Sequence, residues 1–174
     1  MAHEQAAAGV RVNVYGEGHA TVETGLPVLN ALLTRLAEIA RFDVVIDIEP
    51  GDAEAEVDAA AAALGDALSG PLRAERARGH GSGTLTSAEA LASVVLETSD
   101  TPLFVTNVDL TEARIGGLGT DVARRFLERL ADHAGLVLHV RLLHGTDSGH
   151  VLEAIFKALG AALSQACERE GAKA

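Results

Sequence analysis

Aromatic side chains are scarce in this 174-residue sequence, which has no tryptophan, one tyrosine and four phenylalanines. Hydrophobic residues nevertheless make up 48% of the chain, which is enough to bury a core in one domain of this length. We therefore expect a single domain over residues 1–174, with an interior built from leucine, valine, isoleucine and alanine.

Cysteine, basic residues and long apolar runs are scarce as well. Cys167 is the only cysteine, so no disulfide can form within the chain, and a reducing compartment is expected. Lysine and arginine number 14 against 25 acidic residues, and the net charge of -11 argues against nucleic acid and anionic membranes as partners. No uncharged apolar segment approaches the roughly eighteen residues of a membrane span, and the first residues lack the pattern of a secretory signal. We expect a cytoplasmic protein that does not enter a membrane.

The sequence contains an internal repeat. Residues 33–40 (LTRLAEIA) parallel residues 127–134 (LERLADHA), and in both places a helical pattern leads into a strand pattern and then a second helical pattern. The two second helices share an acidic residue followed six positions later by Leu-Gly-x-Ala-Leu; the acidic residues are Asp58 and Glu153. The repeat predicts an α+β architecture of two similar halves, about 10–83 and 84–168, each a small sheet packed with helices.

Local periodicity predicts the individual elements. The predicted strands are 10–14, 20–23, 42–48, 93–97, 103–108 and 136–143, and the predicted helices are 27–39, 57–68, 121–133 and 149–168. Thr24 or Gly25 is expected to cap the first helix. The glycine-rich residues 79–83 are expected to form a flexible loop, and residues 87–92 a short helix. Three bases, Arg73, Arg76 and Arg78, suggest a solvated edge or an anion site.

The strongest candidate for chemistry lies at the start of the last predicted helix. His150 and Glu153 are three residues apart, so both side chains should lie on one face of its first turn. An imidazole and a carboxylate so placed can serve one metal ion or one substrate. The structural alternative is a helix capped by Ser148 or Gly149, in which Glu153 only interacts with the positive end of the helix dipole.

Several segments resemble the imidazoleglycerol-phosphate dehydratase family, an enzyme family of histidine biosynthesis. They are residues 24–29 (TGLPVL), 42–43 (FD), 135–145 (GLVLHVRLLHG) and 150–158 (HVLEAIFKA). The resemblance includes the internal repeat. It implies an α+β fold of two tandem ribosomal protein S5 domain 2-like units, each a small sheet packed with helices. It also implies trimers that join into 24-subunit assemblies, and paired manganese ions at subunit interfaces.

At the metal-ligand positions of that family the sequence matches only in part. His150 and Glu153 match, and Asp58 replaces a glutamate. The positions that should carry the other ligands, mostly histidines, hold Ala31, Glu54, Ala55, Arg125 and Gly149. The substrate positions also differ, with Gly79 and Thr101 where arginines are expected. Lys157 is retained, and the resemblance implies that it contacts the substrate phosphate.

Two functions follow as alternatives. The first is a dehydratase-like protein without dehydratase activity and without a metal, with a structural, assembly or binding role as a homotrimer or a 24-subunit assembly. Such a protein could be a degenerate paralogue or an engineered scaffold. The second is an active manganese-dependent dehydratase, or an enzyme repurposed around Asp58, His150 and Glu153, with His150 and Glu153 as metal ligands. In the first alternative, Arg125 is expected to pair with Glu153 or Asp58 across a subunit interface.

Overall fold

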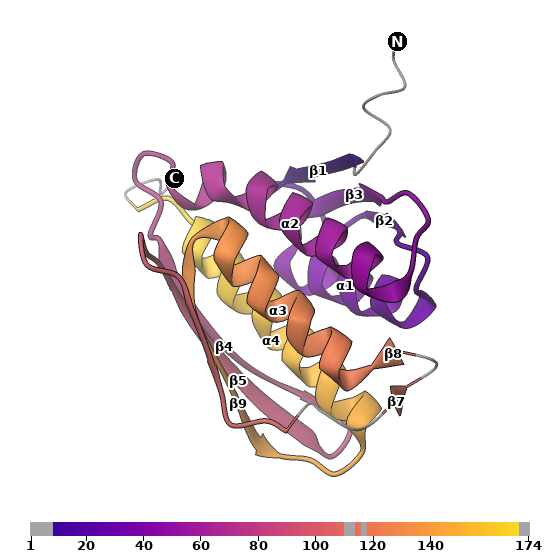
Figure 1. Ribbon diagram of the computed structural model, residues 1–174. Helices are drawn as coiled ribbons and strands as arrows, with labels where there is room; N and C mark the ends of the chain where they lie inside the picture. Colours follow the sequence, from indigo (N-terminus) through magenta and orange to yellow (C-terminus); the bar gives the residue numbers. More distant parts are fainter. Residues whose placement is uncertain (1–8, 110–113, 116–117, 171–174) are drawn as a thin grey trace.

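Two β-sheets enclose four α-helices in the computed structural model, which describes residues 9–109, 114–115 and 118–170 (Figure 1). The first sheet contains β1 (Gly9–Asn13), β2 (Ala20–Glu23) and β3 (Asp43–Asp47) in the order β1-β3-β2. β1 pairs antiparallel with β3, and β2 pairs parallel with it. Helix α1 (Pro27–Ala40) connects β2 to β3, and α2 (Ala53–Leu72) follows β3.

The second half repeats this topology and adds one strand. Its sheet has the order β4-β5-β9-β6, formed by β4 (His80–Ser87), β5 (Ala90–Thr98), β6 (Leu103–Thr106) and β9 (Leu136–His144). β5 is antiparallel and β6 parallel to β9, as β1 and β2 are to β3. The remaining elements are a short hairpin and two helices, β7 (Arg114–Ile115), β8 (Leu118–Gly119), α3 (Thr120–Ala134) and α4 (Ser148–Cys167). The α+β class and the two repeated units are confirmed.

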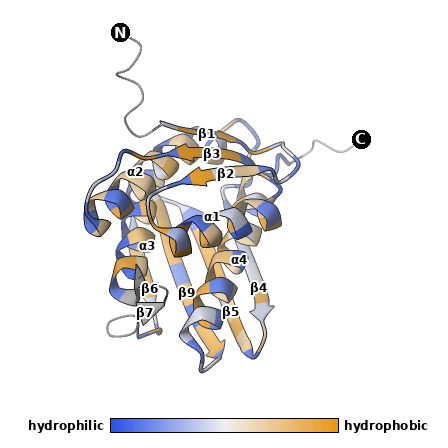
Figure 2. Cartoon of the chain, turned by 90° about the vertical axis from the view of Figure 1, so that its right-hand side faces the viewer, coloured by the Kyte–Doolittle hydropathy of each residue, from blue (hydrophilic) through white to orange (hydrophobic). Residues whose placement is uncertain are grey.

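The helices of the two repeats pack in crossed pairs. α2 packs against α3 and α1 against α4, and Figure 2 shows all four helices between the sheets. The core is largely aliphatic, as predicted, but three phenylalanines are fully buried as well, Phe42, Phe126 and Phe156. The rings of Phe126 and Phe156 lie 5.6 Å apart between α3 and α4.

The glycine of each Leu-Gly-x-Ala-Leu motif allows these helices to approach closely. A Cβ atom at Gly65 of α2 would lie 2.7 Å from the Cβ atom of His133 on α3. A Cβ atom at Gly160 of α4 would lie 2.5 Å from the carbonyl oxygen of Leu36 on α1. Both distances are shorter than van der Waals contact. The repeated glycine is therefore a packing requirement of the fold.

Two predicted elements are wrong. Residues 79–83 do not form a flexible loop, because His80 begins β4, and residues 87–92 form the β4–β5 turn and the start of β5 instead of a helix. The glycines of β4 make room for α4: a Cβ atom at Gly81 would lie 2.2 Å from the carbonyl oxygen of Ala162. Glycine here provides space for a close approach of the helix.

Helix ends also differ from the prediction. The N-cap of α1 is Leu26, with no side-chain cap, because the Thr24 hydroxyl accepts a hydrogen bond from the Leu26 N–H ahead of the helix. α2 continues through Pro71 to Leu72, four residues beyond its predicted end. No helix among the described residues is both long and apolar enough to cross a bilayer.

Arg73 has a structural role that differs from the predicted solvated edge or anion site. Its guanidinium donates hydrogen bonds of 2.8 Å to the carbonyl oxygens of Ala134 and Gly135, at the C-terminus of α3. It also reaches the carbonyl oxygen of Ser99 at 3.4 Å. The arginine at the end of α2 thus caps the first helix of the other repeat, where a cation is favoured by the helix dipole.

Arg73→Ala is expected to lower the free energy of unfolding by about 1.5 kcal/mol, because the carbonyl groups of Ala134 and Gly135 lose a charged donor. Urea denaturation followed by circular dichroism measures this loss. Arg73→Lys is the matched control and should recover only part of the stability. A lysine ammonium cannot reproduce the geometry in which two nitrogens of the planar guanidinium donate to two carbonyl oxygens. Equal stability of Arg73→Ala and the wild type would contradict the capping role.

Candidate functional site

Asp58 lies on α2 and faces two arginines of α3. Its Oδ1 and Oδ2 atoms accept hydrogen bonds from Arg125 Nε at 2.7 Å and Arg125 Nη2 at 3.0 Å, and Arg129 Nε lies 3.6 Å from Oδ1. The hydrogen bonds from Arg125 lower the pKa of the Asp58 carboxyl, and the same pair raises the pKa of Arg125. The predicted pairing of Arg125 with Asp58 is confirmed, but the pair lies within one chain. The prediction of a contact across a subunit interface is wrong for this pair.

Glu153 lies on α4 and faces α1 and the end of β4. It accepts a short hydrogen bond from the Ser87 hydroxyl and another from Arg35 Nε at 3.1 Å. These contacts lower the pKa of Glu153. The hydrogen bond from Ser87 is the main cause, and the hydrogen bond from Arg35 is the next largest cause that lowers it. Arg35 also donates to Glu38 at 3.1 Å. Glu153 is therefore an ionised carboxylate that is held from two sides.

The two carboxylates are related by the internal repeat. Arg35 and Arg129 occupy the same position in the parallel segments 33–40 and 127–134, as Asp58 and Glu153 do in the second helices. In both halves an arginine of the first helix contacts the acidic residue of the other repeat's second helix. The repeated acid thus belongs to a repeated ion pair between the two halves.

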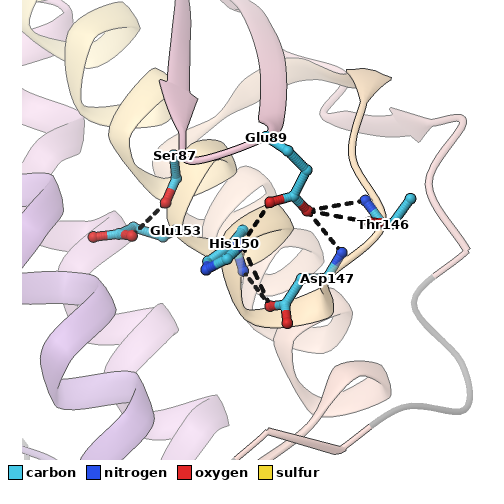
Figure 3. Close-up of polar contacts among 6 residues, drawn as sticks. All are labelled: Ser87, Glu89, Thr146, Asp147, His150 and Glu153. Atoms are coloured by element: carbon cyan, nitrogen blue, oxygen red, sulfur yellow. Dashed lines mark hydrogen bonds and ion pairs between the residues drawn. The ribbon is translucent and has the colours of Figure 1, made fainter.

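His150 belongs to a third cluster, around the β4–β5 turn (Figure 3). Its Nδ1 atom lies 2.6 Å from Glu89 Oε1, and the other oxygen of Glu89 accepts from the backbone N–H groups of Thr146 at 3.1 Å and Asp147 at 2.9 Å. The N–H bond from Asp147 is the main cause that lowers the pKa of Glu89 to about 2, and Glu89 in turn raises the pKa of His150. Figure 3 shows Ser87 and Glu89, at the two ends of one turn, holding Glu153 and His150 respectively.

The start of α4 differs in detail from the prediction. The N-cap is Asp147, whose carboxylate accepts from the His150 N–H at 3.0 Å, in place of the predicted Ser148 or Gly149. His150 therefore lies in the first turn, whereas Glu153, the sixth residue of the helix, lies in the second turn. The two side chains reach opposite ends of the β4–β5 turn and do not converge on one point.

Glu89→Gln is expected to destabilise the protein most between about pH 4.5 and pH 6.5. The lowered pKa of Glu89 stabilises the fold above its ordinary value of 4.5, and this contribution is lost as the pH falls toward 2. The raised pKa of His150 stabilises the fold fully below the ordinary value of 6.5, and this contribution is lost as the pH rises through the folded value. Urea denaturation of both proteins at pH 3, 5.5 and 8.5 measures the difference; these pH values are chosen to bracket the window.

The matched control for this prediction is Glu97→Gln, which removes the same charge from an exposed position of β5. Its effect should be small and should not peak at pH 5.5. A Glu89→Gln difference that stays constant over the three pH values would show that the Glu89–His150 link does not contribute as an ion pair.

Other positions singled out in the sequence lie nearby. Lys157 donates a 2.6 Å hydrogen bond from Nζ to the carbonyl oxygen of Thr86, at the free edge of β4. Ala31 and Gly149 line a hollow of about 710 Å³ between α1 and α4, with Arg35 and Glu153 in its wall. Two of the positions at which the family resemblance implies imidazoles thus line one hollow, and both lack a metal-binding side chain.

The candidate residues therefore divide into separate clusters. His150 and Glu153 lie at one turn, whereas Asp58 is held by α3 on the other helix pair. Within the described part of one chain, no three His, Cys, Asp or Glu side chains are grouped so as to hold a metal ion. Ser87, Glu89 and Arg35 were not found from the sequence, since only the packing of α4 on α1 and on the β4–β5 hairpin brings them to His150 and Glu153.

Comparison with known proteins identifies relatives over most of the chain. The family model of imidazoleglycerol-phosphate dehydratase matches residues 24–163. The imidazoleglycerol-phosphate dehydratase of Nitrosococcus oceani is 36% identical over 163 residues, covering 91% of this chain and 83% of that protein. The enzyme of the same name from Clostridium botulinum (strain Kyoto / Type A2) is 32% identical over 164 residues, with the same coverage.

Solved structures show the same fold. The imidazoleglycerol-phosphate dehydratase of Staphylococcus aureus superposes with a TM-score of 0.85 at 24% identity, covering 93% of this chain and 94% of the other. IGPD from Pyrococcus furiosus, solved in complex with (S)-C348, gives a TM-score of 0.82 at 24% identity, with coverages of 94% and 90%.

Proposed function

From the premise that the chain belongs to the imidazoleglycerol-phosphate dehydratase family, we propose that it is a member without dehydratase activity. In this proposal the chain retains the α+β fold and has a structural, assembly or binding role. The observation that carries the proposal is the contact of Arg125 with both carboxylate oxygens of Asp58.

The Arg125 contact opposes metal binding for an electrostatic reason. The guanidinium places a permanent positive charge, at 2.7 and 3.0 Å, on both oxygens that a cation would use. A divalent ion at Asp58 would have to displace Arg125 and then lie close to its charge. Arg125 also occupies the position at which the family resemblance implies a histidine ligand. An arginine at this position therefore removes the imidazole and also occupies the carboxylate of Asp58.

The other ligand positions support the same proposal. Ala31 and Gly149 offer no donor atom, and Glu153 is held by Ser87 and Arg35. A paired-manganese site needs several imidazole and carboxylate donors with good geometry. The residues present do not fit that group.

One observation favours the alternative, an active carbon–oxygen lyase of histidine biosynthesis. A metal-binding histidine commonly donates its second ring N–H to a carboxylate, and Glu89 is so placed against His150 Nδ1 at 2.6 Å. The Nε2 atom of His150 is then free to act as an acceptor toward a ligand. In this alternative, manganese would be held by His150 and Glu153 together with groups from another subunit.

Metal content and turnover decide between the two functions. The purified chain should contain substoichiometric manganese after incubation with the ion, and it should not convert imidazoleglycerol phosphate. The dehydratase of Nitrosococcus oceani, prepared in the same way, is the positive control. Arg125→Ala leaves only Arg129 beside Asp58 and should still be inactive, because Ala31 and Gly149 remain. Stoichiometric manganese with turnover would refute the proposal and establish the alternative.

The proposed assembly is a homotrimer, and the family resemblance extends it to a 24-subunit particle. Native mass spectrometry distinguishes the trimer from the 24-subunit particle.

The net charge of -11 supports a role that involves neither nucleic acid nor an anionic membrane. The single cysteine and the lack of a secretory pattern support a place in the cytoplasm.

A further inference from the structure

The two sheets differ at one edge. The strands β1, β3 and β2 correspond to β5, β9 and β6, but β4, which pairs with β5, has no counterpart beside β1 among the residues that the structure describes. Among residues 9–109, 114–115 and 118–170, β1 pairs with β3 and with no other strand, and Figure 1 shows it as the outermost strand of its sheet. An uncovered edge of this kind presents backbone N–H and C=O groups to any strand that can pair with it.

Burial at this edge is incomplete on the side that faces the core. Val10 and Val12 pair with Ile46 and Val44 of β3, and both valines pack against the core but are only half-buried. The equivalent residues of β5, Val94 and Leu96, pair with Val140 and Leu138 of β9 and are 0% and 1% exposed. β4 pairs with β5 at the corresponding place, whereas no described strand lies beside β1, and this accounts for the difference in burial.

The edge of β4 shows how the same fold covers an exposed strand. Gln165 of α4 accepts a hydrogen bond from the Ser82 N–H at 2.8 Å, and Lys157 of α4 donates to the Thr86 carbonyl oxygen at 2.6 Å. Two side chains of one helix thus bind backbone groups of the outer edge of β4. This cover makes β4 a poor acceptor for a further strand and leaves β1 as the better candidate.

The segment 10–14, which comprises the last four residues of β1 and the first residue of the turn after it, is nearly symmetric about Val12. Residues 10–14 read Val-Arg-Val-Asn-Val, so an antiparallel copy centred on Val12 would place Val12 opposite Val12, Val10 opposite Val14, and Arg11 opposite Asn13. The three valines would then lie together on the core-facing side. Arg11 is the only charged residue of the segment, and this register sets it beside an amide and not beside another arginine.

We propose that β1 pairs antiparallel with β1 of a second copy of this chain, across a two-fold axis at Val12, to form one continuous six-stranded sheet. The segment is self-complementary, as a two-fold interface requires. The pairing also buries the half-exposed valines of both copies. The proposal concerns the first sheet alone and does not rest on the presence or absence of dehydratase activity.

Cysteine cross-linking tests the register directly. Val12→Cys places two thiols opposite each other across the axis, within the separation that a disulfide spans. Val10→Cys is the matched control, since two copies of residue 10 would lie four residues out of register, roughly 14 Å apart. The native Cys167 is buried, with a pKa raised to about 11 by burial, so it should not react under mild oxidation.

The expected result is a covalent dimer of the full chain that forms at least about ten-fold faster for Val12→Cys than for Val10→Cys. An equimolar mixture of Val10→Cys and Val14→Cys should also cross-link, because those positions face each other. Equal rates for the two single variants, or none for either, would overturn the proposal. Cross-linking of Val12→Cys only after removal of residues 2–8 would also overturn it, by showing that the chain's own first residues cover the edge.

A charge exchange provides a second, non-covalent test. Asn13→Arg sets Arg11 opposite a second arginine at two places, and it should weaken self-association by roughly ten-fold in sedimentation equilibrium. The double variant Arg11→Asn with Asn13→Arg restores one arginine opposite one asparagine and should recover the wild-type association. Both variants lose the hydrogen bond that the Asn13 side chain accepts from the Tyr15 N–H, so the loss of that bond does not distinguish them. Thr21→Arg, on the exposed face of β2, controls for added charge, and an equal weakening by Thr21→Arg would overturn the proposal.

Discussion

Gly81→Ala is expected to lower the free energy of unfolding by about 3 kcal/mol, the upper part of the range for overpacking. The added Cβ atom would lie 2.2 Å from the carbonyl oxygen of Ala162 and 3.0 Å from the backbone nitrogen of Ala166. Both obstacles are backbone atoms of α4, so no side-chain rotation relieves the clash. β4 cannot move away without losing its register with β5, which runs from His80 to Ser87.

The small gain that alanine normally brings to a strand does not offset this clash. Replacing glycine within a strand by alanine contributes only about 0.5–1 kcal/mol of backbone entropy. Urea denaturation of the wild type and the variant measures the net effect. Ser82→Ala is the matched control, because that side chain is exposed on the other face of β4, and its effect should stay within about 0.5 kcal/mol. A stable Gly81→Ala would mean that α4 does not lie on β4 at this distance.

Gly160→Ala is expected to destabilise the protein by about 2.5 kcal/mol, because its Cβ atom would lie 2.5 Å from the Leu36 carbonyl oxygen. Helix propensity alone predicts the opposite sign, a gain of up to about 1 kcal/mol. Urea denaturation of the wild type and of Gly160→Ala measures the net sign. A stabilised Gly160→Ala would exclude the close contact between α1 and α4.

The repeated architecture could be predicted from the sequence because the same residue types recur at the same spacing in both halves. The acid and the Leu-Gly-x-Ala-Leu motif recur at one spacing, and Asp58 and Glu153 occupy equivalent places in α2 and α4. What the pattern could not give is the partner of each acid. Arg125 was identified with Asp58 as one possible partner, whereas Glu153 is bound by Arg35 and Ser87. Such partners depend on how the two halves cross, which local spacing does not encode.

The glycine-rich segment 79–83 was wrongly assigned from the sequence. In the segment 79–83, alternating Gly81 and Gly83 suggested a loop, yet both lie in β4 facing α4. A glycine can provide backbone conformational freedom, or it can provide room for another element to approach closely. The atoms that lie opposite the glycine decide which of these applies. Here those atoms belong to a helix that comes much later in the chain. Glu89 could not be predicted for the same reason, since its partner His150 is brought to it only by the turn geometry.

The position of α4 has a consequence for synthesis on the ribosome. α4 packs on α1, β4 and β5, and it follows all of them in the chain. Until its twenty residues have left the ribosome, neither α1 nor the second sheet has its main covering surface, and apolar residues of both halves stay exposed to solvent. The nascent chain should therefore depend on chaperones until α4 emerges, and a stop codon before Ser148 should yield an aggregating product and not a folded first half.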